Sequence, residues 1–221
     1  MARSTNAWTA SSIYNRWMAD QLYLSLWYPN FRLTSLGPAL LGVIRQFTIV
    51  GGPGLVRAAN AYPISWNEAP AYQRVYDDDE AELAAPEQAV PAALEMLHDD
   101  FAYEFELTWE LWTPEQAGDL DPIWRKEPRV VRIIGYGPEF DEGAYEQNGQ
   151  IRVDFGTDTP FLLEDAELDA EVAEHIKQNI QMLVDFTNGV QQHCGISSRL
   201  LWSESGESLA QKLIARLQQV N

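Results

Sequence analysis

Two glutamates, Glu104 and Glu106, are the residues whose type and spacing best suit acid–base chemistry. They alternate with apolar residues, so a β-strand would project both from one face, about 6.5–7 Å apart. That separation is near the lower end of the range found in inverting glycosidases. Tryptophans that could stack on sugar rings stand nearby at 109, 112 and 124. One hypothesis is therefore a carboxylate-based hydrolase acting on a glycan or a similar neutral polar substrate, with Glu104 and Glu106 as catalytic residues.

The same spacing also describes an ordinary solvated sheet face. Arginines 129, 132 and 152 stand on segments expected to be neighbouring strands, where they would pair with the glutamates. We favour this interpretation, in which Glu104, Glu106 and Glu110 are binding residues and Trp112 is an aromatic anchor at the rim. It predicts a non-enzymatic binding or protein–protein interaction protein, whose partner is a basic protein or a small polar ligand.

Motifs for phosphate binding and nucleophilic catalysis are incomplete. Gly51-Gly-Pro-Gly54 follows an apolar run, but Arg57 stands where a dinucleotide fingerprint needs a third glycine. Cys194 is adjacent to His193, and adjacent side chains rarely form a nucleophile–base pair. A tight turn and an unreactive thiol are the expected roles of these segments.

The sequence also lacks a metal motif. Glu171 and His175 are four residues apart, which places them on one face of a helix, but no further ligands follow at suitable spacing. We therefore expect no metal site and no cofactor.

Charge divides the chain into two parts. Residues 1–76 carry a net charge of +4, with arginine as the only basic residue type, and residues 77–221 carry −22. Three explanations are open: solubility, docking of the arginines on the acidic remainder, and recruitment of a basic partner. The overall charge of −18 argues against binding to nucleic acid or to anionic membranes.

The clearest predicted element is a strand over 101–112. Its odd-numbered residues, from Phe101 to Leu111, are all apolar and should face a core. The other predicted elements are a helix from Ser11 or Ser12 to Tyr28, a strand at 43–50, a possible strand at 71–76, a helix opening at Pro86, a strand at 130–136, a hairpin of 144–147 with 150–155, a helix from Asp165, a strand at 197–203 and a last helix from Ser205. The hairpin turns at Asn148-Gly149 and would place Tyr145 opposite Arg152.

This order predicts an α+β fold: an antiparallel meander sheet covered on one face by C-terminal helices. We expect residues 1–221 to form a single integrated unit, because 1–76 offers too few clear elements for a core of its own. The start of the chain has no signal-peptide pattern, and its longest apolar stretch is interrupted. With one cysteine as well, the predicted location is the cytoplasm. The oligomeric state stays open.

Overall fold

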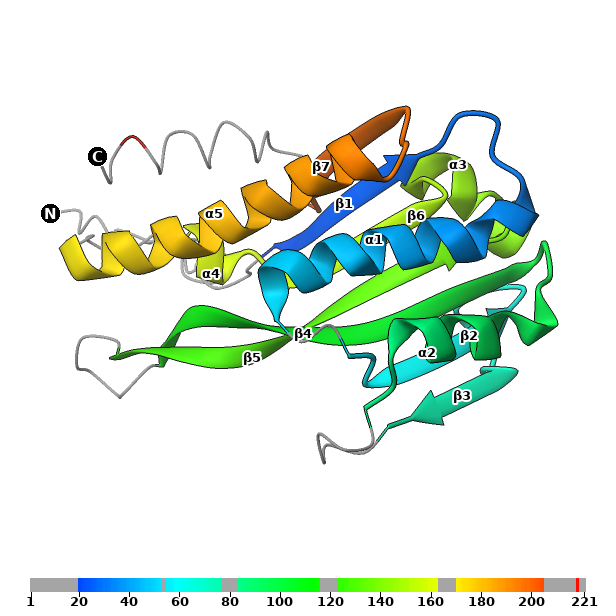
Figure 1. The fold of residues 1–221 in the computed structure, drawn as a ribbon, viewed down its shortest axis with the longest axis horizontal. Helices are drawn as coiled ribbons and strands as arrows, with labels where there is room; N and C mark the ends of the chain where they lie inside the picture. Colours follow the sequence, from blue (N-terminus) through cyan, green and yellow to red (C-terminus); the bar gives the residue numbers. More distant parts are fainter. Residues whose placement is uncertain are drawn as a thin grey trace, which may run out of the picture.

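The centre of the protein is a seven-stranded antiparallel sheet with the strand order β3-β2-β4-β5-β6-β1-β7. A computed structural model describes residues 20–52, 55–76, 83–115, 123–162, 170–204 and 218. The strands are β1 (Gln21–Trp27), β2 (Ala58–Pro63), β3 (Tyr72–Val75), β4 (Phe101–Glu115), β5 (Ile123–Tyr136), β6 (Ile151–Thr157) and β7 (Ser198–Ser203). Together with the helices, this sheet makes the fold α+β, as predicted (Figure 1).

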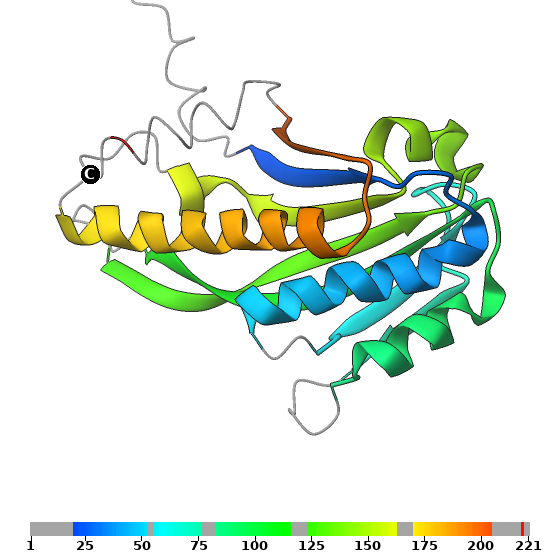
Figure 2. The same cartoon turned by 45° about the horizontal axis from the view of Figure 1, so that its top comes forward.

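Three helices lie on one side of the sheet: α1 (Leu36–Gly51), α2 (Pro86–Ala93) and α5 (Ala170–His193) (Figures 1 and 2). The shorter helices are η1 (Leu33–Ser35), η2 (Leu94–Met96), η3 (Phe140–Glu142), α3 (Ala144–Asn148) and α4 (Thr159–Leu162). The cover thus includes α1 and α2, which precede the longest strands in the chain. The last predicted helix, from Ser205, lies outside the described residues.

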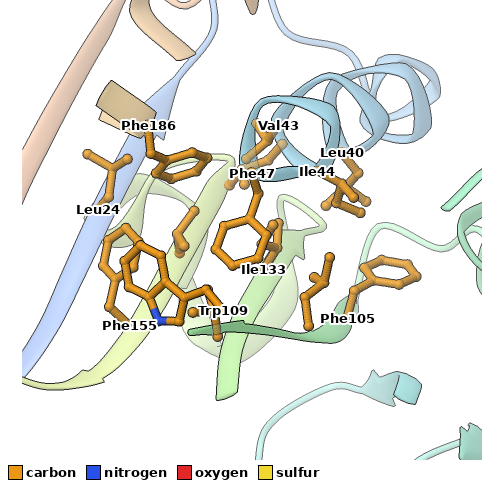
Figure 3. Close-up of a cluster of buried hydrophobic side chains, with 14 of the residues drawn as sticks. Leu24, Leu40, Val43, Ile44, Phe47, Phe105, Trp109, Ile133, Phe155 and Phe186 are labelled. Atoms are coloured by element: carbon orange, nitrogen blue, oxygen red, sulfur yellow. The ribbon is translucent and has the colours of Figure 1, made fainter. Parts of the chain in front are cut away.

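The alternating face of β4 forms the middle of the core, as predicted. Its residues Phe101, Tyr103, Phe105, Leu107, Trp109 and Leu111 are all buried. Trp109, only 1% exposed, has its ring centroid 5.5 Å from that of Phe47 in α1 and 5.4 Å from that of Phe155 in β6. Phe186 of α5 packs in the same cluster, with its ring centroid 5.7 Å from that of Phe47 (Figure 3). Strict alternation therefore identified the core face of the sheet.

The prediction of a helix ending at Tyr28 is wrong where the structure describes it, because residues 21–27 form strand β1. Leu22, Leu24 and Leu26 are fully buried, at a spacing of two residues. The helix prediction relied on the four-residue spacing of Leu24 and Tyr28 and overlooked the two-residue spacing of the buried leucines. Residues 11–19 of that prediction lie outside the described residues.

The strand predicted at 43–50 is also wrong, because this segment belongs to helix α1. Its fully buried residues recur at helical spacing: Leu36, Leu40, Val43, Ile44 and Phe47. The β-branched residues suggested a strand, but packing on the sheet overrides that weak preference. By length and composition alone, Leu33–Gly51 is apolar enough to cross a membrane, a property that core helices share.

The predicted hairpin around Asn148-Gly149 does not form. Residues 144–148 are helix α3, and β6 pairs instead with β5 and β1. Gly149 has a φ of +83°, and a Cβ there would lie 2.5 Å from the carbonyl oxygen of Leu26. The glycine therefore permits a close approach to β1 rather than a two-residue turn.

Strands from both charge regions share the one sheet. β1 lies between β6 and β7, and β2 lies between β3 and β4. The remaining strand predictions, near 71–76, 130–136 and 197–203, and the helix opening at Pro86 are confirmed.

Candidate functional site

The face of the sheet opposite α1, α2 and α5 carries a network of charged and aromatic side chains. We call it the polar face and define it by Asn60, Glu104, Glu106, Arg132, Arg152, Asp154, Tyr23 and Tyr136, which come from strands β2, β4, β5, β6 and β1. Within the described part of the chain, the cover on this side is one small apolar cluster that includes Phe140 and Ala144. The network therefore lies beside a short cap at one end of the sheet.

Strand register arranges the polar face in rows that cross the sheet. One row runs Asn60, Glu104, Ile134, Arg152 and Ser25. The next row runs Ala58, Glu106, Arg132, Asp154, Tyr23 and Trp202. In the second row, acidic and basic residues alternate on neighbouring strands, which favours cross-strand pairing, whereas Ile134 separates Glu104 from Arg152 in the first.

The two glutamates share one arginine. Arg132 Nε donates to Glu106 Oε1 at 2.9 Å and lies 3.9 Å from Glu104 Oε2. Asn60 Nδ2 donates to Glu104 Oε1 at 3.1 Å. Glu104 is 9% exposed, whereas the Glu106 side chain is 27% exposed. The predicted pairing with an arginine of the neighbouring strand is thus made by Arg132.

Burial and charge act in opposite directions on this group. Burial raises the pKa of Glu104, and the bond from Asn60 and the charge of Arg132 offset only part of that rise. Burial alone would lower the pKa of Arg132, but Glu106, Glu104 and Asp154 together raise it. Arg132 is therefore a firmly charged centre between carboxylates, while Glu104 takes up a proton more readily than an ordinary glutamate.

Arg152 is held differently, by aromatic rings. Its guanidinium carbon lies 5.0 Å from the ring centroid of Tyr23 and 5.6 Å from that of Tyr136. These contacts replace the predicted stacking on Tyr145, whose ring lies 6.0 Å from that of Phe31. Within the described residues, Arg152 has no carboxylate within 4.0 Å, and its Nε is buried without a hydrogen-bond partner.

Two further polar atoms of the face are buried without partners. They are the hydroxyl of Tyr136, which is fully buried, and Oδ1 of Asn60. Burial raises the pKa of Tyr136, so this hydroxyl stays protonated and can donate. Trp66 and Phe140 close this end of the face, with ring centroids 6.2 Å and 6.0 Å from Tyr136.

The other two predicted binding residues lie far from Glu104. Six and eight residues further along β4, Glu110 and Trp112 are about 20 and 26 Å away. Glu110 is exposed, but Trp112 stacks on His175 of α5 at 3.8 Å and donates its indole N–H to Gln178. The structure therefore brings Glu104 and Glu106 together but leaves Glu110 and Trp112 outside the network.

The predicted sugar platform is not present. Trp109 belongs to the core. The indole nitrogen of Trp124 is buried, and its ring centroid lies 5.7 Å from that of His175. Neither ring stands beside the glutamate pair. These positions remove the sugar-stacking argument for a glycan hydrolase.

The weaker sequence motifs also take structural roles. Gly51 is the last residue of α1 and Gly52 caps it, so both lie at the C-terminal end of the helix, where the helix dipole disfavours an anion. Burial raises the pKa of Cys194 to about 11, which makes the thiol unreactive. Among the described residues, no group of three or more His, Cys, Asp or Glu side chains could hold a metal ion.

Docking of the N-terminal arginines on the acidic region has one described example. Arg45 of α1 lies 3.1 Å from Glu87 of α2, and both side chains are more than half exposed. Such an exposed pair contributes little to stability. The glutamates of the polar face take their arginine from β5, within the acidic region itself.

Sequence reasoning placed Arg152 near the glutamates, although its contacts are with tyrosines, and it missed Tyr136, Tyr23 and Asn60 as members of the same site. The alternation within β5 and β6 was the available signal for Tyr136 and Arg152. No local signal places Tyr23 beside them, because β1 reaches β6 across 125 residues of chain or more. Searches of family models, curated proteins and solved structures found no match to this chain.

Proposed function

We propose that the protein is a non-enzymatic binding protein whose polar face receives a small polar ligand. The observation that carries this proposal is that three of the eight buried polar atoms without partners among the described residues belong to this face: Asn60 Oδ1, Tyr136 Oη and Arg152 Nε. Most buried polar groups in folded proteins have a hydrogen-bond partner, because an unpaired one costs about 1–3 kcal/mol. Neighbouring side chains cover these atoms, so a ligand with donors and acceptors would supply the missing hydrogen-bond partners once those side chains move aside.

The two kinds of partner expected from the sequence are not equally supported. Glu104 is nearly buried and Glu106 is paired with Arg132, so neither offers a free negative charge to a basic protein. A small polar ligand is therefore favoured. Of the three glutamates predicted as contacts for a basic partner, Glu110 is the one with an exposed side chain. The high negative charge of the chain supports the further proposal that the protein binds neither nucleic acid nor anionic membranes. The single cysteine supports the proposal of a cytoplasmic location.

A carboxylate-based hydrolase is the second candidate. It is favoured by the raised pKa of Glu104, a property of a general acid. Its weakness is Glu106, whose carboxylate is occupied by Arg132.

We also retain the proposal that the C-terminal helices, α5 and the one predicted from Ser205, together cover the face of the sheet opposite the polar face.

A library of small polar compounds screened by NMR tests the binding proposal. In ¹⁵N-labelled protein, compounds that bind should shift the amides of Asn60, Tyr136 and Arg152, and leave those of α1 and α5 unchanged. Asp154→Trp, which places a bulky ring beside Arg152 on the polar face, should abolish these shifts. Gln88→Trp, an exposed position on α2, is the matched control and should retain them. Shifts confined to the helical side would contradict the proposal.

A further inference from the structure

The polar face contains two arginines in different states. Arg132 is neutralised by Glu106 at 2.9 Å, with Glu104 3.9 Å away. Arg152 has no such carboxylate among the described residues, although it is partly buried. A guanidinium that is partly withdrawn from water and has no carboxylate within ion-pair distance is a natural receptor for an anionic group.

The nearest acidic neighbour on the same strand does not serve as that counter-charge. Asp154 follows Arg152 by two residues on the same face of β6, a separation of about 6.5–7 Å. Its Oδ1 instead accepts the backbone N–H of Gly156 at 2.8 Å. Across the sheet, the register neighbours of Arg152 are Ile134 and Ser25, and neither carries a charge.

Aromatic contacts fix the orientation of Arg152. The guanidinium carbon lies over both tyrosine rings, at 5.0 Å from Tyr23 and 5.6 Å from Tyr136. Tyr23 is itself held by Trp202, 4.7 Å away, and donates its hydroxyl to Glu204. A guanidinium held in this way loses little side-chain entropy when it binds an anion. Its terminal nitrogens are not buried and have no hydrogen-bond partner among the described residues.

We infer that Arg152 is the anion-binding residue of the polar face and receives an oxyanion group of the ligand, a carboxylate or a phosphate. The inference rests on the proposed function and names the chemistry of its ligand. Both groups match the planar fork of the guanidinium. The anion would contact the terminal nitrogens of Arg152, because the hydroxyl of Tyr136 is buried beneath the contact. Because Glu104 and Asp154 lie nearby, a simple anion should bind only in the millimolar range.

NMR titration with acetate, and separately with inorganic phosphate, tests the inference at constant ionic strength set with sodium chloride. Both anions should saturably shift the Arg152 Nε–H signal and the backbone amides of Val153 and Asp154, and these amides are the readout in variants that lack the Arg152 side chain. The anion that binds more tightly identifies the oxyanion class. Arg152→Gln should weaken binding at least about tenfold, a loss of about 1.4 kcal/mol. Arg129→Gln is the matched control, since this exposed arginine on β5 pairs with Glu127, and it should bind within about twofold of wild type.

A second variant keeps the test valid if Arg152→Gln does not fold. Arg152→Lys retains the charge but loses the planar fork, so acetate binding should fall more than phosphate binding. The absence of saturable shifts in the wild-type protein, or unchanged binding in both Arg152 variants, would overturn the inference. Neutral polar compounds that bind the face while both anions fail would remove this inference alone. If neither neutral compounds nor anions bind, the proposed function fails with it.

Discussion

Glu104 is a carboxylate in a nearly closed position, and its protonation should be visible in the stability of the protein. Burial raises its pKa in the folded state. The stabilisation from its protonated form is present below the unfolded pKa, about 4.3, and is lost as the pH rises through the folded pKa. Asn60 and Arg132 reduce this loss but do not cancel it.

Glu104→Gln should therefore gain stability relative to wild type as the pH rises from about 4 to about 7. The measurement is urea unfolding of both proteins across that range, compared as a difference in the free energy of unfolding. Glu110→Gln, at an exposed position of the same strand, is the control and should give a nearly constant difference. If the difference in the free energy of unfolding between Glu104→Gln and wild type stays constant or falls as the pH rises, the assigned direction of the Glu104 pKa shift is contradicted.

Trp109 is the largest fully buried side chain of the core. Trp109→Ala should lower the free energy of unfolding by about 3–5 kcal/mol, because it leaves a cavity between Phe47 and Phe155. Chemical denaturation measures this loss. Val75→Ala, at a position 72% exposed, should change the value by no more than about 0.5 kcal/mol. A Trp109→Ala variant as stable as the Val75→Ala variant would place Trp109 outside the core.

At the scale of elements, one side chain of α5 fastens the edge of β4. Asn179 accepts the backbone N–H of Trp112 at 3.0 Å and donates to its carbonyl oxygen at 2.7 Å. It also donates to the carbonyl oxygen of Pro160 in α4 at 2.8 Å. The amide thus takes the place of a neighbouring strand, since β2 pairs with β4 only up to Glu106.

Asn179→Ala should destabilise the protein by about 2–4 kcal/mol, because it leaves buried backbone groups without partners. Amide hydrogen exchange at Trp112 should accelerate in this variant. Gln178→Ala removes two exposed side-chain bonds, the one from the Trp112 indole and the one to Glu174, and should cost about 1 kcal/mol or less. Equal effects of the two substitutions would show that Asn179 has no special role at this edge.

At the scale of the whole molecule, the sheet joins the two charge regions. Residues 1–76 supply β1, which lies between β6 and β7, and β2, which pairs with β4. A protease site introduced between Asp78 and Asp79 should therefore yield two fragments that stay associated. Size-exclusion chromatography after cleavage measures this association. Release of a folded, monomeric fragment of 87–221 would instead establish two independent domains.

The sequence alone determined the elements whose patterns are regular and local. Alternation over 101–112 identified the core face of β4 and placed Glu104 and Glu106 together on the other face, because side chains alternate in any strand. The pairing of a glutamate with Arg132 followed from adjacent strands. The α+β class came from the order of these elements.

Only the tertiary structure decided the elements whose local patterns are ambiguous. Residues 21–27 and 43–50 are short apolar segments, and packing on the sheet made one a strand and the other a helix. The contact of Arg152 with the Tyr23 ring depends on β1 lying beside β6, and these two strands are far apart in the chain. Local propensity carries no information on such pairings, because their free energy comes from burial shared by both segments.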